Sequence, residues 1–129
     1  MLIKTPDQKW KEAILAYRKN CQKILAVSKS IRYVGVINEY GRTLTGMMQS
    51  GLKPMLKSED VKNEFFIISN LITLRNSQSK AFGALNHVTL RHQNATLVCV
   101  PHNKVIYYVS INPKAKSIDE IIRKIKSLL

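Results

Sequence analysis

Two cysteines and three histidines are the side chains in this sequence with the most scope for nucleophilic or metal chemistry. Cys21 lies on the apolar stripe of an expected helix and Cys99 lies inside an apolar strand, where burial keeps a thiol protonated and inert. No CxxC pair is present, so a zinc or redox motif is unsupported. His87, His92 and His102 have few carboxylates near them in the sequence. We therefore expect neither a metal site nor a Cys–His nucleophile pair.

Other catalytic and nucleotide-binding signatures are absent from the sequence. It contains no GxxxxGK[ST] or GxGxxG phosphate loop and no GxSxG nucleophile motif. Most of the eight acidic residues fall at the expected starts of helices, where the helix dipole accounts for them. We therefore expect a protein that is not an enzyme and that needs no cofactor.

The sequence is strongly basic, with 21 Lys and Arg residues against eight Asp and Glu and a formal net charge of +13. Such a charge favours an anionic partner, which would be nucleic acid, an anionic membrane surface or an acidic protein. The positive charges are spread along the chain without a long run, so no basic tail is predicted. A generally basic surface without a defined site is the other interpretation.

Eight elements are expected to position these residues, in the order α-β-β-α-β-β-β-α. The helices are expected at 6–28, 58–79 and 118–129, and the strands at 31–38, 43–49, 85–92, 95–100 and 105–111. The first, fourth and fifth strands are apolar on both sides, which is typical of central strands, so the second and third are expected at the edges. Short connections favour antiparallel pairing. The fold class is therefore α/β (α+β): one domain, 1–129, with a single five-stranded, mostly antiparallel sheet and helices on both faces.

The helix starts carry capping signals. Thr5 is a candidate N-cap for the first helix and Ser58 for the second. Ser117 and Glu120 form a candidate capping box for the last helix, in which each side chain would accept from the other residue's amide.

Apolar stripes predict which helix faces are buried. The first helix has one narrow stripe, on which Trp10 and Tyr17 are expected to be core residues. The second helix has two adjoining stripes, one at Val61, Phe65, Ile68 and Ile72 and the other at Ile67, Leu71 and Leu74. Together they are wider than a simple surface helix needs. Two interpretations remain open: a deeply buried helix, or a helix shared between the core and a partner subunit.

The element order resembles the Roadblock domain of the profilin-like and longin-like group, whose five-stranded antiparallel sheet has the strand order 2-1-5-4-3. The segment SIRYVGVINEYGRTLTGMMQSGLKPML, at 30–56, is also similar to an uncharacterised archaeal family predicted to share this fold. That match is carried by Ile31, Arg32, Tyr33, Val36, Ile37, Asn38, Gly41, Gly51, Leu52 and Pro54. The resemblance implies one helix on one face of the sheet and the terminal helices on the other.

The resemblance also implies a non-catalytic dimerising platform for small GTPases, motor proteins or membrane-associated signalling assemblies. It places a candidate dimer interface on the long central helix and the edge strand after it, at Ile67, Leu71, Leu74, His87 and Thr89. This edge strand is short and polar, which departs from the family's pattern. If the terminal helices share one face, their basic residues would merge into a candidate face for an anionic partner, at Arg18, Lys19, Lys23, Arg123, Lys124 and Lys126.

Three functions follow from these observations. The first is a homodimeric interaction or regulatory module, the second is a nucleic-acid-binding protein that uses the basic face, and the third is a small-ligand sensor with an apolar pocket. The N-terminal residues lack a signal-peptide pattern and no apolar run is long enough to span a membrane, so we expect a cytoplasmic protein.

Overall fold

The computed structural model describes residues 3–129, which contain a five-stranded antiparallel sheet with the strand order β2-β1-β5-β4-β3. Its strands are β1 (Ile31–Asn38), β2 (Thr43–Met48), β3 (Val88–Arg91), β4 (Thr96–His102) and β5 (Val105–Ile111). Its helices are α1 (Pro6–Leu25), α2 (Ser58–Asn76), α3 (Ser79–Phe82) and α4 (Ile118–Ser127). The predicted order of elements is confirmed, apart from the additional short helix α3. The predicted central and edge positions of the strands are confirmed as well.

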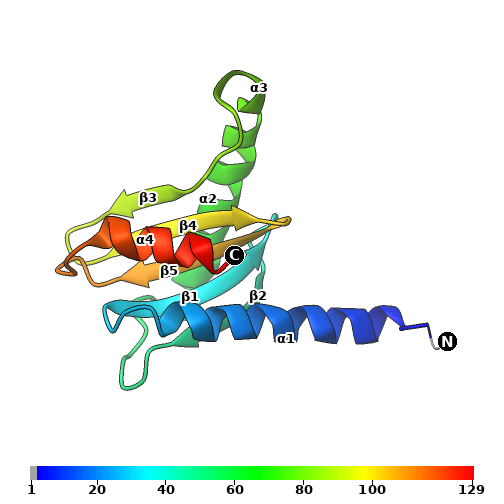
Figure 1. The fold of residues 1–129 in the computed structure, drawn as a ribbon, viewed down its shortest axis with the longest axis horizontal. Coiled ribbons are helices and arrows are strands. Elements are labelled where there is room, and N and C mark those ends of the chain that lie inside the picture. The colour runs from blue at the N-terminus through cyan, green and yellow to red at the C-terminus, as the bar shows by residue number, and fades with distance from the viewer. Residues whose placement is uncertain (1–2) are drawn as a thin grey trace.

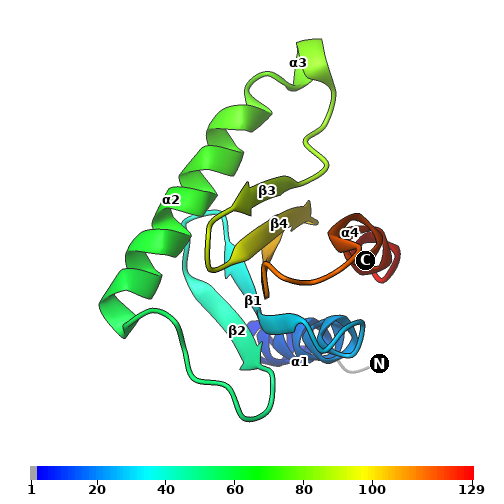
Figure 2. The same cartoon turned by 90° about the vertical axis from the view of Figure 1, so that its left-hand side faces the viewer.

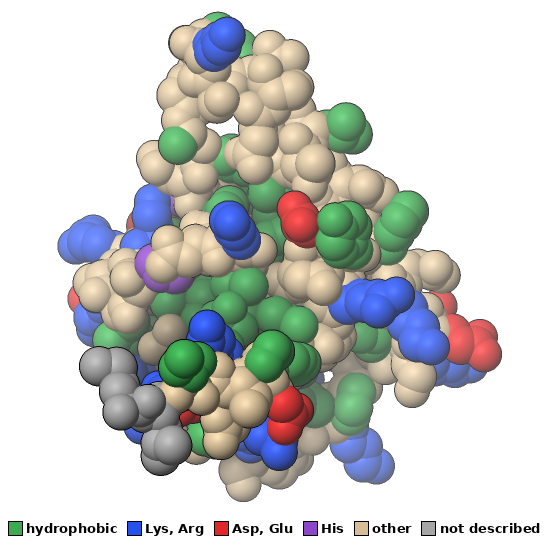
Figure 3. Space-filling view, turned by 90° about the vertical axis from the view of Figure 1, so that its right-hand side faces the viewer, with side chains coloured by type: hydrophobic (Ala, Val, Ile, Leu, Met, Phe, Trp, Pro, Cys, Tyr) green, Lys and Arg blue, Asp and Glu red, His purple; other side chains and the backbone are tan. Residues whose placement is uncertain are grey.

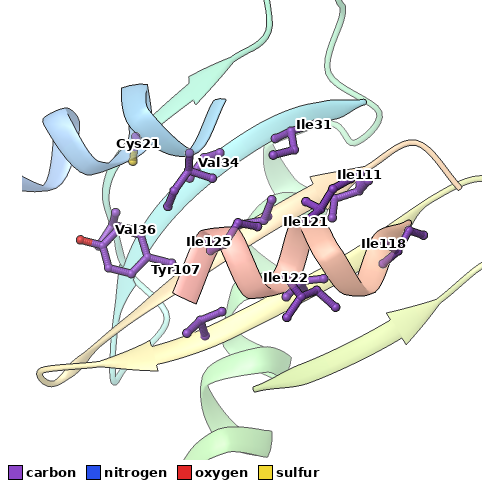
Figure 4. Packing of buried hydrophobic residues seen from close by; sticks show 14 of the residues in the cluster. Cys21, Ile31, Val34, Val36, Tyr107, Ile111, Ile118, Ile121, Ile122 and Ile125 are labelled. Carbon is purple, nitrogen blue, oxygen red and sulfur yellow. The ribbon is translucent and has the colours of Figure 1, made fainter. Parts of the chain in front are cut away.

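Helices cover both faces of the sheet, as predicted. α1 and α4 lie on one face and α2 lies on the other (Figures 1 and 2). On the first face, the buried isoleucines of α4 pack with side chains of β1, β4 and β5, and α1 contributes buried Cys21 and Ile24 (Figure 4). On the second face, Phe65, Ile68 and Ile72 of α2 pack against side chains of β1, β4 and β5. The three central strands are therefore apolar in both directions because each of them contributes to two cores.

The capping predictions are confirmed for one helix and wrong for two. Thr5 caps α1 in a capping box, since its Oγ1 accepts from the amide of Gln8 at 3.2 Å and its own amide donates to the Gln8 side chain at 3.0 Å. α2 begins at Ser58 itself, behind Lys57, without a side-chain cap. Ser117 precedes α4 with a φ of 59°, and its side chain makes no capping bond. A capping side chain needs extended backbone, so this left-handed conformation removes the predicted capping box.

α1 reaches beyond the sheet, so part of its apolar stripe has nothing to cover (Figure 1). Trp10 is 48% exposed, and its predicted place in the core is therefore wrong. Tyr17, nearer the middle of the helix, is half-buried and packs against the core. The periodic stripe predicts a direction for these side chains but not where the sheet ends.

The predicted third strand is longer than β3. The ladder between β3 and β4 runs only from the pair Val88–Cys99 to the pair Arg91–Thr96, so His87 and His92 lie outside the strand. Continuing the ladder toward 86 would bring the chain opposite Pro101, which has no amide hydrogen to donate. The three long helices also end two or three residues earlier than predicted, at Leu25, Asn76 and Ser127.

Candidate interaction surface

α2 is apolar on two opposite sides, and only one of them is buried. The first stripe packs on the sheet through Phe65, Ile68 and Ile72. On the second stripe, Ile67 is 59% exposed and Leu74 is 70% exposed. The interpretation of α2 as a helix buried along both stripes is therefore wrong. The exposed side chains of the second stripe are available to a partner.

Three exposed apolar side chains and half-buried Leu71 form a defined surface, which we call the outer face of α2 (Phe66, Ile67, Leu71 and Leu74). At about 100° per residue, Ile67 lies about 200° around the helix from buried Phe65, so the two point in opposite directions. The C-terminal half of α2 and α3 extend past the β3 edge of the sheet (Figures 1 and 2). On α3 the ring of Phe82 is exposed, with the guanidinium of Arg75 5.8 Å from its centre.

The two edge-strand residues of the candidate interface lie on the other side of the sheet from α2. Thr89 is paired with Val98, which belongs to the core under α1 and α4. His87 lies beside α4, with Nδ1 3.5 Å from Nζ of Lys126. Burial and the charge of Lys126 lower the pKa of His87. The structure therefore groups Ile67, Leu71 and Leu74 on one face of α2 and separates them from the side chains of His87 and Thr89.

Sequence reasoning missed two members of this exposed apolar region, Phe66 and Phe82. Phe66 falls on neither stripe chosen from the spacing, although it lies next to Ile67 in the sequence. Phe82 lies in α3, which was not predicted as a helix. The signal that could have found Phe66 is the run of four bulky apolar residues at 65–68, which no single helix face can hold.

The six candidate basic residues share a sheet face but do not all gather. Arg18 turns toward β2, since its Nη1 donates to Oγ1 of Thr45 at 3.4 Å. Lys126 instead lies beside His87, next to β3 at the opposite edge of the sheet. Lys124 forms an ion pair of 3.5 Å with Glu120. The other three, Lys19, Lys23 and Arg123, are exposed and form no ion pair within the described residues.

Figure 3 shows Lys and Arg side chains scattered over the side of the molecule where α1 begins, with hydrophobic side chains exposed between them. A single merged basic face therefore stays a prediction.

The two cysteines are buried in different cores, as expected. Burial raises the pKa of Cys21 to about 11, although the positive charge of Arg18 lowers it in part. Burial also raises the pKa of Cys99 to about 12. Both thiols are therefore protonated at neutral pH, which makes them poor nucleophiles.

Across residues 3–129, no group of three or more His, Cys, Asp or Glu side chains could hold a metal ion. No helix in the same part of the chain has the length and apolar character needed to cross a membrane.

The sequence matches no protein-family model and no curated protein, whereas the fold has clear neighbours among solved structures. A Roadblock/LC7 domain from Streptomyces avermitilis superposes with a TM-score of 0.65 at 11% identity, over 85% of this chain and 88% of that one. MglB with a tetrameric arrangement superposes with a TM-score of 0.71 at 10% identity, over 99% of this chain and 88% of that one. The chain has the Roadblock/LC7 fold.

This Roadblock fold also relates the chain to profilins, as predicted for the wider group. Acanthamoeba castellanii profilin II superposes with a TM-score of 0.53 at 14% identity, over 85% of this chain and 90% of that one. The superpositions establish a shared fold. At identities this low they establish no more, so function has to be argued from the surfaces. The similarity of 30–56 to an archaeal family stays a prediction.

Proposed function

We propose that this Roadblock-like chain is a non-catalytic interaction module that forms a homodimer through the outer face of α2. The observation that carries the proposal is the exposure of Ile67 and Leu74 on a helix whose other side is already packed. Exposed apolar side chains that gather into one contiguous surface commonly mark the place where a partner binds.

A two-fold dimer suits this surface because each copy presents the same patch to the other. Complete burial of an aliphatic or aromatic side chain contributes about 1.5–3 kcal/mol, and the outer face holds Phe66, Ile67 and Leu74 on each subunit. Asn63 and Asn70 lie on the same side of the helix as these side chains. Because both are uncharged, they would not repel the same residues of a second copy. The outer edge of β3 has no neighbouring strand within the sheet, so its backbone groups can pair with a second copy.

The relatives support an assembling role. One of the similar structures is MglB in a tetrameric arrangement. The resemblance to Roadblock domains also implies that the dimer presents its remaining surface to another protein, of which a small GTPase is an example. The net charge of +13 favours a partner with an acidic surface, because opposite charges speed encounter and fix orientation.

Light scattering behind size exclusion tests the proposal, at low and at high salt and with and without nucleic acid. The expected result is a species of twice 14.7 kDa that persists at high salt and ignores nucleic acid. Persistence at high salt is the signature of apolar burial, whereas phosphate contacts weaken steeply as salt rises. A monomer that changes size only with nucleic acid at low salt would replace the proposal with the basic-face alternative.

A further inference from the structure

A groove of about 720 Å³ opens on the α2 side of the sheet, at the end where α2 begins. We call the sheet residues of its lining the floor and the segment at 53–56 the roof; the first turns of α2 and the β3–β4 connection at 92–95 complete the lining. Met48, Met55, Leu56, Val61 and Phe65 give it a mainly apolar lining. Known pockets for small molecules span roughly 300–1,000 Å³ and are lined in the same way. Its lining shares no residue with the outer face of α2.

The floor of the groove is aromatic because two glycines leave room for a ring. Gly35 on β1 and Gly46 on β2 are paired across the strands, and the Tyr33 ring lies over both of them. A Cβ atom at Gly35 would stand only 2.6 Å from the Tyr33 hydroxyl oxygen. Tyr108 stands edge-on to Tyr33, with 6.3 Å between ring centres. The two rings form a firm apolar platform under the groove.

A β-bulge places a positive charge beside this platform. Along β1, Ile31 packs into the core under α1 and α4, whereas Tyr33 packs against the α2 core, although residues two apart in a regular strand face the same way. The register with β5 shifts between these two residues. Arg32, the residue inside the shift, lines the groove. Bulges of this kind redirect a side chain and recur beside functional sites.

The half-buried Arg32 side chain makes no hydrogen bond or ion pair with the residues that the structure describes. Its Nε is buried and has no hydrogen-bond partner within the described residues, and Arg32 forms no ion pair there. Lys53 adds a second positive charge to the lining. The one carboxylate of the lining, Glu64, accepts a hydrogen bond from Tyr108 at 2.8 Å. The groove therefore combines an apolar body with a net positive charge, and the accessible part of the Arg32 side chain carries one of the two cations of its lining.

We propose that this groove binds a small amphipathic carboxylate, such as a medium-chain or long-chain fatty acid, with its head on Arg32 and its chain along the apolar lining. A guanidinium presents five N–H donors in a fork that matches a carboxylate, and such charged pairs are stronger than neutral hydrogen bonds. The thioether side chains of Met48 and Met55 adapt their shape to an aliphatic chain.

Titration calorimetry with dodecanoate below its micelle concentration tests the inference against three matched probes. Dodecanol keeps the chain without the charge, dodecyltrimethylammonium reverses the charge, and acetate keeps the head without the chain. Dodecanoate is expected to bind at least about tenfold more tightly than each of these, because both parts of the site contribute. Equal affinity for dodecanol and dodecanoate, or no binding of dodecanoate to the folded protein, would overturn the inference.

Variants locate the bound molecule. Arg32→Met should weaken dodecanoate binding by about tenfold or more and leave dodecanol binding unchanged, while Arg42→Met, at an exposed arginine of the β1–β2 hairpin, should change neither. Leu56→Asp adds a carboxylate to the roof without touching the core and should also weaken binding, whereas Leu15→Asp on exposed α1 should not. Circular dichroism confirms that each variant is folded. Wild-type affinity in both folded groove variants would contradict the assignment.

Discussion

The hydroxyl of Tyr108 donates a hydrogen bond of 2.8 Å to Oε2 of Glu64 and thereby joins β5, in the middle of the sheet, to α2. Tyr108 is buried, and its ring also meets Phe65 of α2 edge to face, with 4.9 Å between ring centres. Burial and the bond to Glu64 raise the pKa of Tyr108, so the phenol stays a donor throughout the neutral range. This hydrogen bond and the aromatic pair hold α2 against the sheet, and α2 also presents the proposed dimer surface.

Removing this hydroxyl is expected to loosen α2. Tyr108→Phe keeps the ring and its packing but leaves the carboxylate of Glu64 without its donor. We expect the free energy of unfolding to fall by about 1.5–3 kcal/mol, the usual contribution of a hydrogen bond to a charged group, because Glu64 is only partly exposed to water. Chemical denaturation measures the change. Tyr40→Phe, at an exposed tyrosine, is the control and should leave stability unchanged, and an equal effect in both variants would show that the contact contributes nothing.

Charges on the outer face of α2 are expected to dissociate the proposed dimer. Ile67→Glu and Leu74→Glu replace side chains that are exposed in one copy, so each variant should fold normally as a monomer. In the dimer the carboxylates would be buried without partners, at a cost of several kcal/mol. Light scattering should therefore show a monomer for both variants. Leu15→Glu, on the exposed side of α1, is the matched control and should remain dimeric; a dimer that survives both α2 substitutions would place the interface elsewhere.

Alkaline conditions should destabilise the fold through its two buried thiols. Folding raises the pKa of Cys21 and Cys99 from an ordinary 9.0 to about 11 and about 12, so the unfolded chain loses these protons first. Stability is therefore complete below pH 9 and falls as pH rises from 9 toward these values. Between pH 9 and pH 10 each thiol should remove about 1 kcal/mol from the free energy of unfolding.

Cys99→Ala isolates one of the two thiols. This variant is less stable at every pH because a cavity replaces the sulfur, but its stability should decline less steeply above pH 9. Urea denaturation at pH 8, 9 and 10 gives the slopes for both proteins. Parallel slopes would mean that Cys99 ionises as easily in the folded protein as in the unfolded chain.

The layers of this fold were predictable from the sequence because each central strand must be apolar on both sides to join two cores. Val34 faces α1 and α4 while Ile37 faces α2, and that double pattern alone places β1 in the middle of the sheet. The exposed Ile67 and Leu74 were also visible as a second stripe, although spacing could not decide between core and surface. The position of Arg32 was not predictable, since it depends on a bulge in the pairing of β1 with β5, far along the chain.

The Tyr33 platform gives a last prediction, because its two glycines and one ring depend on one another. Gly35→Ala would place a methyl group against the Tyr33 ring, which lies over Gly35 and Gly46. Overpacking of this kind costs about 1–3 kcal/mol. In a Tyr33→Leu background the ring is gone, so the same substitution should cost much less. Chemical denaturation of wild type, both single variants and the double variant gives the coupling energy, expected above about 0.5 kcal/mol for side chains in contact. A cost for Gly35→Ala that is the same in both backgrounds would show that a contact other than the one with the Tyr33 ring decides this position, because backbone entropy alone favours alanine over glycine.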